Sequence, residues 1–190
     1  MNLTCPKSEY LEISDDILDL AKDLLTPDEI QSAIEISLNL LNKATRSEAK
    51  KILKEMVGLR PKRPIYYTYY EIDRLPHWTR YAIENLGHFV DLMVKDLATE
   101  KLANSKCQTM SLGINLLKVK TEIPSELHSS LLKFNSAIYV PSKHDFKVDE
   151  SIRKHRFTTK EVVFTIFITL KLKEKLVEMS YAVKDYCENG

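Results

Sequence analysis

The sequence predicts an all-α protein, a bundle of about six to eight helices with an N-terminal three-helix appendage. Hydrophobic residues recur at helical spacing through most of the 190-residue chain. Gly (4) and Pro (7) are too few for a low-complexity, collagen-like or disordered chain. The length suits one domain, with or without an appendage, and is sufficient to bury a hydrophobic core without metals or disulfides.

Three successive segments within residues 1–58 carry helix-start signals. The first follows Ser14, where two aspartates favour the positive end of a helix dipole. The second and third open with capping-box patterns, from Thr26 to Glu29 and from Thr45 to Glu48. Each start is followed by an apolar stripe at helical spacing, so we expect a small helical unit of three short helices here.

Residues 59–75 are predicted to connect this unit to the rest of the chain. The stretch GLRPKRP, residues 58–64, combines a helix-stopping glycine, two prolines and three basic residues. Four tyrosines in five positions follow, in IYYTYYEIDR. Either these tyrosines pack on both neighbouring units, or they bind single-stranded nucleic acid together with nearby basic residues. Those basic residues are Arg60, Lys62, Arg63, Arg74 and Arg80.

Residues 76–190 are expected to form the helical bundle itself. Pro76 is predicted at the first position of a long helix, in which Gly87 allows another helix to approach closely. Two further helices are predicted in SLGINLLKVKTE and in PSELHSSLLKFNSAIY. After Tyr139 the chain is expected to turn, because Pro141 cannot continue the helix.

The last helix is predicted to be the most hydrophobic element. Thr158 and Glu161 form a third capping-box pattern at its start. The stretch VVFTIFIT suits a strand on propensity, but the apolar pattern continues to Tyr181, which is too long for a strand. Its apolar residues face several sides, so we expect a buried helix with Phe167 and Leu170 in the core.

The polar corner before this helix holds the densest cluster of ionisable groups in the chain. A histidine beside carboxylate and basic groups can transfer protons or hold a phosphate. The alternative is a capping network at two helix ends, with the basic residues in solvent. The candidate catalytic residue is His144, and the candidate binding residues are Asn135, Lys143, Asp145, Arg153 and Arg156.

The stretch FNSAIYVPSKHDF, with the basic segment, RFTTKEVV and the long terminal helix after it, resembles a divergent member of the HEPN superfamily. The resemblance covers residues 76–186 and implies an up-and-down helical bundle, often dimeric. In many members it implies metal-independent RNA cleavage, whereas others are inactive scaffolds or partners of nucleotidyltransferases. Active members carry an arginine, a polar residue and then a histidine. His144 matches the histidine and Asn135 the polar position, but lysines stand where the arginine is expected.

Two functions are therefore expected. The first is a non-catalytic helical interaction module, associated with defence or nucleotide-modifying partners. The second is an RNA-binding or metal-independent RNA-cleaving domain that uses the His144 corner. A second copy of the chain, another protein or RNA are the partners that fit these functions, and the net charge of +1 demands no nucleic acid.

No cofactor or metal site is predicted. The five histidines form no helical pair four residues apart, and no Gly-rich phosphate-binding motif occurs. The three cysteines lie far apart, which indicates reduced thiols. No signal peptide is recognisable, and the longest apolar run, VVFTIFITL, is too short to span a bilayer. We expect a cytoplasmic protein without membrane segments.

Overall fold

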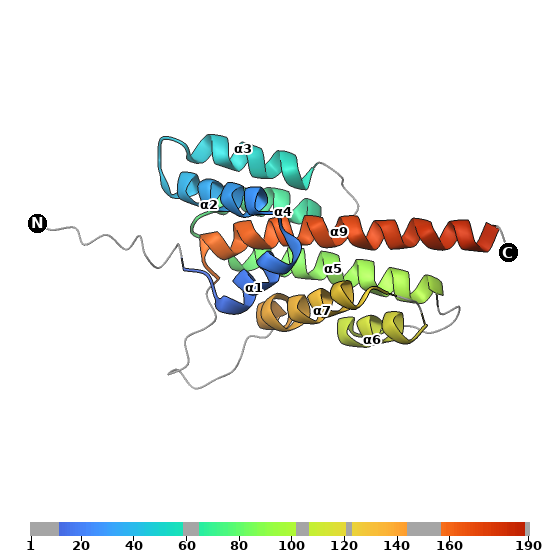
Figure 1. Ribbon diagram of the computed structural model, residues 1–190. Helices are drawn as coiled ribbons and strands as arrows, with labels where there is room; N and C mark the ends of the chain where they lie inside the picture. Colours follow the sequence, from blue (N-terminus) through green and yellow to red (C-terminus); the bar gives the residue numbers. More distant parts are fainter. Residues whose placement is uncertain (1–11, 59–64, 102–106, 121–122, 144–156, 189–190) are drawn as a thin grey trace, which may run out of the picture.

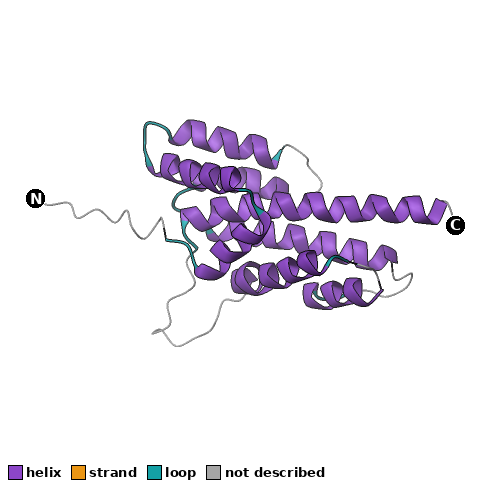
Figure 2. Ribbon diagram, viewed as in Figure 1, coloured by secondary structure: helices purple, strands orange, loops and turns teal. Residues whose placement is uncertain are grey.

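A computed structural model describes residues 12–58, 65–101, 107–120, 123–143 and 157–188. All regular elements in these ranges are helical and none is a strand, which confirms the all-α prediction (Figure 2). The elements are α1 (Asp15–Leu24), α2 (Pro27–Leu41), α3 (Arg46–Val57), α4 (Ile65–Glu71), the 3-10 turn η1 (Ile72–Arg74), α5 (Arg80–Lys101), α6 (Met110–Lys120), α7 (Ser125–Phe134), the π-helical turn η2 (Asn135–Tyr139), α8 (Val140–Lys143) and α9 (Thr159–Glu188).

Helix α9 is the element on which the others pack. It contacts α1, α2 and α5 extensively and α3 and α7 to a smaller extent. Figure 1 shows it between α2 and α3 on one side and α5, α7 and α6 on the other. Helix α4 packs on α3 and α5.

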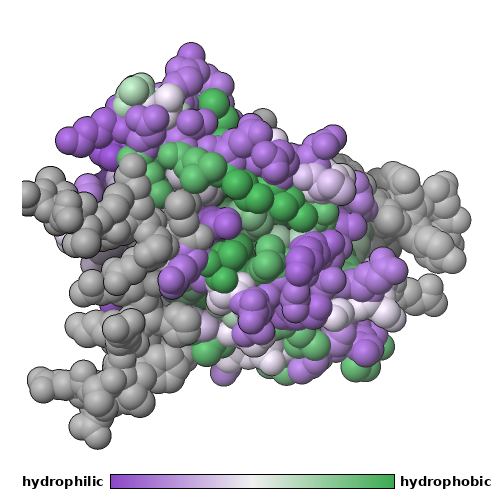
Figure 3. Space-filling view, turned by 60° about the vertical axis from the view of Figure 1, so that its left-hand side comes forward, coloured by the Kyte–Doolittle hydropathy of each residue, from purple (hydrophilic) through white to green (hydrophobic). Residues whose placement is uncertain are grey.

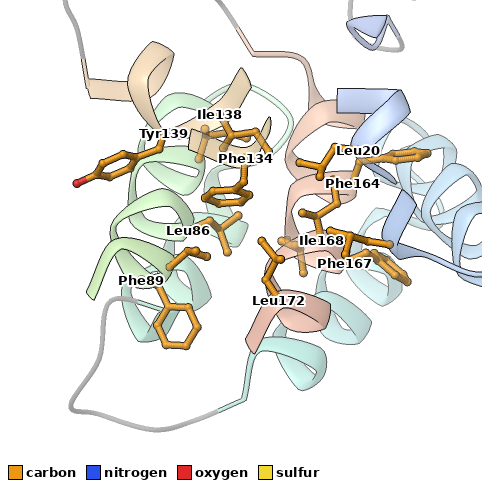
Figure 4. Close-up of a cluster of buried hydrophobic side chains, with 14 of the residues drawn as sticks. Leu20, Leu86, Phe89, Phe134, Ile138, Tyr139, Phe164, Phe167, Ile168 and Leu172 are labelled. Atoms are coloured by element: carbon orange, nitrogen blue, oxygen red, sulfur yellow. The ribbon is translucent and has the colours of Figure 1, made fainter. Parts of the chain in front are cut away.

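The hydrophobic core centres on the first half of α9. Phe164, Ile168 and Leu172 are fully buried, as are Leu86 of α5 and Phe134 of α7, and Figure 4 shows all five in one cluster. The β-branched residues of α9 are therefore helical because neighbours cover them on several sides, and this packing outweighs their strand propensity. As expected, Phe167 is buried, but Leu170 is only partly buried and lies at the margin of the core.

Two of the three predicted capping boxes form. The Thr26 hydroxyl accepts from the backbone N–H of Glu29 at 3.2 Å, and the Thr26 N–H donates to the Glu29 carboxylate at 2.8 Å. Thr158 and Glu161 make the same pair of bonds at 3.1 and 2.8 Å. The box predicted at Thr45 is absent, because this residue has a helical conformation instead of an extended one and its hydroxyl donates to the Asn39 carbonyl.

The predicted start of α5 at Pro76 is wrong by four residues. Helix α5 begins at Arg80, and Pro76 lies in the preceding turn. This turn is held by the start of α9: the Thr159 hydroxyl donates to the Pro76 carbonyl at 3.3 Å. In the same way the Thr79 hydroxyl donates to the Phe157 carbonyl at 2.5 Å. Long-range contacts, which no local pattern reveals, therefore set this boundary.

The predicted turn after Tyr139 is also wrong, since the chain continues as α8 to Lys143. Pro141 is the second residue of α8, directly after a π-helical turn, and a proline is tolerated in the first turn of a helix. Gly58 ends α3 with a φ of 72°, as its position predicted. Residues 59–64 lie outside the described ranges, and residues 65–74 of the predicted connector are helical.

The surface is not uniformly polar. On the face drawn in Figure 3, hydrophobic residues gather in a strip with hydrophilic residues on both sides. Among the helices that the structure describes, none combines the length and the hydropathy needed to cross a membrane.

Candidate functional site

The structure describes only part of the predicted corner. His144, Asp145, Arg153 and Arg156 lie outside the described residues. Asn135 and Lys143 are described, and both line one cleft of about 330 Å³ between α5, the start of α6 and the segment η2–α8. The structure therefore brings together the two predicted residues that it describes. The other lining residues are Lys95, Gln108, Thr109, Met110, Ser111, Tyr139 and Val140.

A buried carboxylate lies beside this cleft. The side chain of Asp91 is 1% exposed, and its Oδ2 accepts hydrogen bonds from Tyr139 Oη at 2.5 Å and Lys95 Nζ at 2.8 Å. His88 Nδ1 is 3.8 Å from the same oxygen. The other oxygen, Oδ1, has no hydrogen-bond partner among the described residues. The ammonium of Lys95 compensates the buried charge, which otherwise would be costly.

Tyr139 is held as a hydrogen-bond donor. Burial, together with the hydrogen bond to Asp91 and the charge of that carboxylate, raises the pKa of Tyr139 well above its usual value. The phenol therefore stays protonated and donates its hydrogen bond to Asp91. Lys143 contacts the phenol oxygen, and its Nζ lies 4.1 Å from the ring centroid. Figure 4 shows the Tyr139 hydroxyl directed away from the hydrophobic cluster.

The π-helical turn η2 lies against α5 at Gly87. A Cβ at this position would be 2.9 Å from Tyr139 Cδ2 and 3.5 Å from Ser142 Oγ, so the predicted close approach is confirmed. Isolated π-helical turns are frequent at functional sites. Here the turn carries Asn135 and Tyr139 at its two ends and directs both to the cleft.

Sequence reasoning missed Asp91 and Lys95. The available signal was an aspartate on the otherwise apolar face of α5, four residues after Gly87 and four before Lys95. Residues at this spacing share one helix face. A carboxylate on a buried face requires a partner, but the sequence does not say which helix supplies it.

A second neighbourhood exposes large aromatic side chains, and we call it the aromatic surface. It consists of Tyr67 and Tyr70 on α4, Trp78 in the following turn and Tyr81 on α5, each 48–61% exposed. Trp78 and Tyr81 are stacked, with ring centroids 6.1 Å apart and planes 12° apart. The guanidinium of Arg74 lies 5.9 Å from the Trp78 ring centroid.

For Tyr67 and Tyr70, these exposures contradict the interpretation that the tyrosines pack on both neighbouring units. Only Tyr69 among the described tyrosine side chains of α4 packs against the core, and it is partly buried. Tyr67 and Tyr70 are exposed. The side chain of Tyr66 lies outside the described part of the chain. The alternative, in which the tyrosines bind single-stranded nucleic acid together with nearby basic residues, stays a prediction.

A second cleft adjoins this surface at Tyr69 and Asp73, and we call it the lysine cleft. It has a volume of about 640 Å³ and lies between α3 and the segment α4–η1. Lys54 Nζ is 2.6 Å from Asp73 Oδ1, and Lys50 Nζ donates to the Asp73 carbonyl at 2.5 Å. The lining residues are Ser47, Lys50, Lys51, Lys54, Glu55, Gly58, Tyr69 and Asp73.

No group of three or more His, Cys, Asp or Glu side chains is placed to hold a metal ion within the described ranges. Comparison of the chain with protein-family models, with curated proteins and with solved structures finds no match.

Proposed function

We propose that the protein is a non-catalytic helical interaction module that binds single-stranded RNA on the aromatic surface. The observation that carries the proposal is the exposed, stacked pair of Trp78 and Tyr81 with Arg74 beside it. Proteins that bind single strands without a base code combine aromatic side chains, on which bases stack, with basic groups that contact phosphates. Both kinds of group lie here within fifteen residues of chain, from Tyr67 to Tyr81.

The exposure of these rings supports a ligand. A tryptophan side chain brings a large apolar area, and proteins usually bury most of it. Trp78 is instead 55% exposed, and its stacked partner Tyr81 is 48% exposed. A nucleobase is a flat ring that can extend such a stack, and every base has a suitable face, so the contact tolerates different sequences.

Isothermal titration calorimetry with a single-stranded oligouridylate tests this function. Replacing Trp78 by Ala removes a stacking contact worth about 1–3 kcal/mol, and we expect binding to weaken by about fivefold to a hundredfold. Val119→Ala is the control, since Val119 is an apolar residue on α6 that is 76% exposed. Equal affinities of the two variants would contradict the proposal.

A second candidate function is metal-independent RNA cleavage at the corner, as the HEPN resemblance implies. One observation favours it: Asn135 and Lys143 line the same cleft. Cleavage of varied RNA substrates in the presence of EDTA, abolished by His144→Ala at unchanged helical circular dichroism, would support it. An inactive wild type, together with a lowered melting temperature of His144→Ala, would leave the histidine with a structural role.

A further inference from the structure

The lysine cleft is lined by three lysines of α3, Lys50, Lys51 and Lys54, and by the acidic residues Glu55 and Asp73. Arg46, Lys50 and Lys54 follow one another at intervals of four residues and so share a face of α3. Like charges at this spacing destabilise a helix, unless something of opposite charge lies against them. Burial, with added repulsion from Arg46 and Lys54, lowers the pKa of Lys50, which agrees with this crowding.

In the free protein, Asp73 supplies the opposite charge. Its carboxylate is bonded to Lys54 and its carbonyl oxygen to Lys50, so η1 places two oxygens of one residue on two lysines. The Asp73 side chain is 59% exposed, whereas that of Lys54 is 21% exposed. The carboxylate is therefore the outer member of the pair and can leave without disturbing buried groups.

We propose that the lysine cleft is a phosphate-binding site, and that Asp73 occupies the place of the phosphate in the free protein. A phosphate offers several acceptor oxygens to ammonium groups, where the carboxylate offers two. The cleft of about 640 Å³ has room for a phosphate and part of the group to which it is attached. For one source of the phosphate, the backbone of an RNA strand, this inference rests on the proposed function. Asp73 directly precedes Arg74, which lies beside Trp78 of the aromatic surface, so a strand stacked on Trp78 would bring its backbone close to the cleft.

The test measures binding of inorganic tripolyphosphate and of a single-stranded oligouridylate to the full chain by calorimetry. Asp73→Asn frees Lys54 and removes a competing charge, and we expect tripolyphosphate to bind about twofold to tenfold more tightly. Asp19→Asn is the matched control, since Asp19 also forms an exposed pair with a lysine, Lys22, at 3.3 Å. Lys51→Ala, at a side chain 65% exposed, should weaken binding without affecting the fold.

The two probes separate the sources of the phosphate. Tighter binding of both probes by Asp73→Asn assigns the cleft to the backbone of the RNA strand. Tighter binding of tripolyphosphate alone assigns the cleft to a free phosphate compound, and this result stands even if Trp78→Ala shows that no RNA stacks on the aromatic surface. The proposal is overturned if Asp73→Asn binds neither probe more tightly than Asp19→Asn does, or if Lys51→Ala leaves the affinity for tripolyphosphate unchanged.

Discussion

At the scale of single residues, Tyr139 connects the π-helical turn to α5. Its hydroxyl donates to a carboxylate that is 1% exposed, so Tyr139→Phe leaves the buried charge of Asp91 with one donor fewer. We expect this variant to lower the free energy of unfolding by about 1–3 kcal/mol. Tyr81→Phe is the control, because it also removes a tyrosine hydroxyl, but from an exposed ring. Urea denaturation should show a change in its free energy of unfolding below about 0.5 kcal/mol. Equal losses in the two variants would refute the role assigned to Asp91.

A second residue, His128, makes stability depend on pH. It is buried in α7, and burial, with the charge of Lys118, lowers its pKa from the usual 6.5. The unfolded chain therefore binds a proton at a higher pH than the folded protein does. Folding is favoured by the neutral ring, and the stability that this provides is lost as the pH falls below about 6.5.

His128→Phe should remove this contribution. Urea midpoints at about pH 7.5 and about pH 5.5 should differ less for the variant than for the wild type. The same difference in both proteins would show that His128 does not titrate within this range.

The sequence predicts residues of a site when one helix carries them. Asn135 and Lys143 lie on the continuous segment η2–α8, and they do meet at one cleft. Asp91 and Lys95 could not be assigned to this cleft, because Asp91 is 48 residues from its partner Tyr139 along the chain. Only the packing of α5 on η2 brings Asp91 and Tyr139 together.

At the scale of elements, the capping-box pattern predicts two helix starts correctly. The capping boxes at Thr26 and Thr158 form, and both helices start where the pattern places them. Pro76 and Pro141 misled the prediction for a different reason. The start of α9 holds the turn at Pro76, and the π-helical turn precedes Pro141, so tertiary contacts and an irregular turn decided both boundaries.

The close packing of η2 on α5 predicts how a methyl group added at Gly87 changes the stability. In Gly87→Ala the new Cβ would lie 2.9 Å from Tyr139 Cδ2 and 3.4 Å from Tyr139 Cα, so the turn must shift. We expect a loss of about 1–3 kcal/mol, although alanine favours a helix over glycine. Thr99→Ala, at an exposed position of α5, gains helix propensity without a clash and should not destabilise the protein. A thermal melt of Gly87→Ala at or above the wild-type temperature would contradict this packing.

At the scale of the whole molecule, the predicted N-terminal unit is in contact with the rest of the chain. Helices α1 and α2 pack on α9, and Leu20 of α1 lies on the same side of α9 as Phe164 (Figure 4). Polar contacts join the same parts: the Ser14 N–H donates to the Glu161 carboxylate at 3.0 Å, and Lys171 Nζ is 3.0 Å from Glu29. The sequence showed each of these helices but not the surface that each of them covers.

A fragment of residues 59–190 should therefore fold poorly. Loss of α1 and α2 uncovers buried side chains of α9, and each large apolar side chain left in water costs about 1.5–3 kcal/mol. We expect circular dichroism to show a broad or absent melting transition for this fragment. If residues 59–190 melted cooperatively at the temperature of the full chain, the N-terminal unit would be an independent appendage.

The position of Trp78 also determines what the intrinsic fluorescence of this protein reports. It is the single tryptophan of the chain, and it lies on the surface at 55% exposure, apart from the core around α9. Indole emission depends on the solvent around the ring, and Trp78 is already in contact with water when the protein is folded. The ultraviolet fluorescence of the chain is therefore a weak reporter of unfolding. It should instead respond, in colour and in intensity, whenever a ring or a chain covers the aromatic surface, with no label attached to either partner.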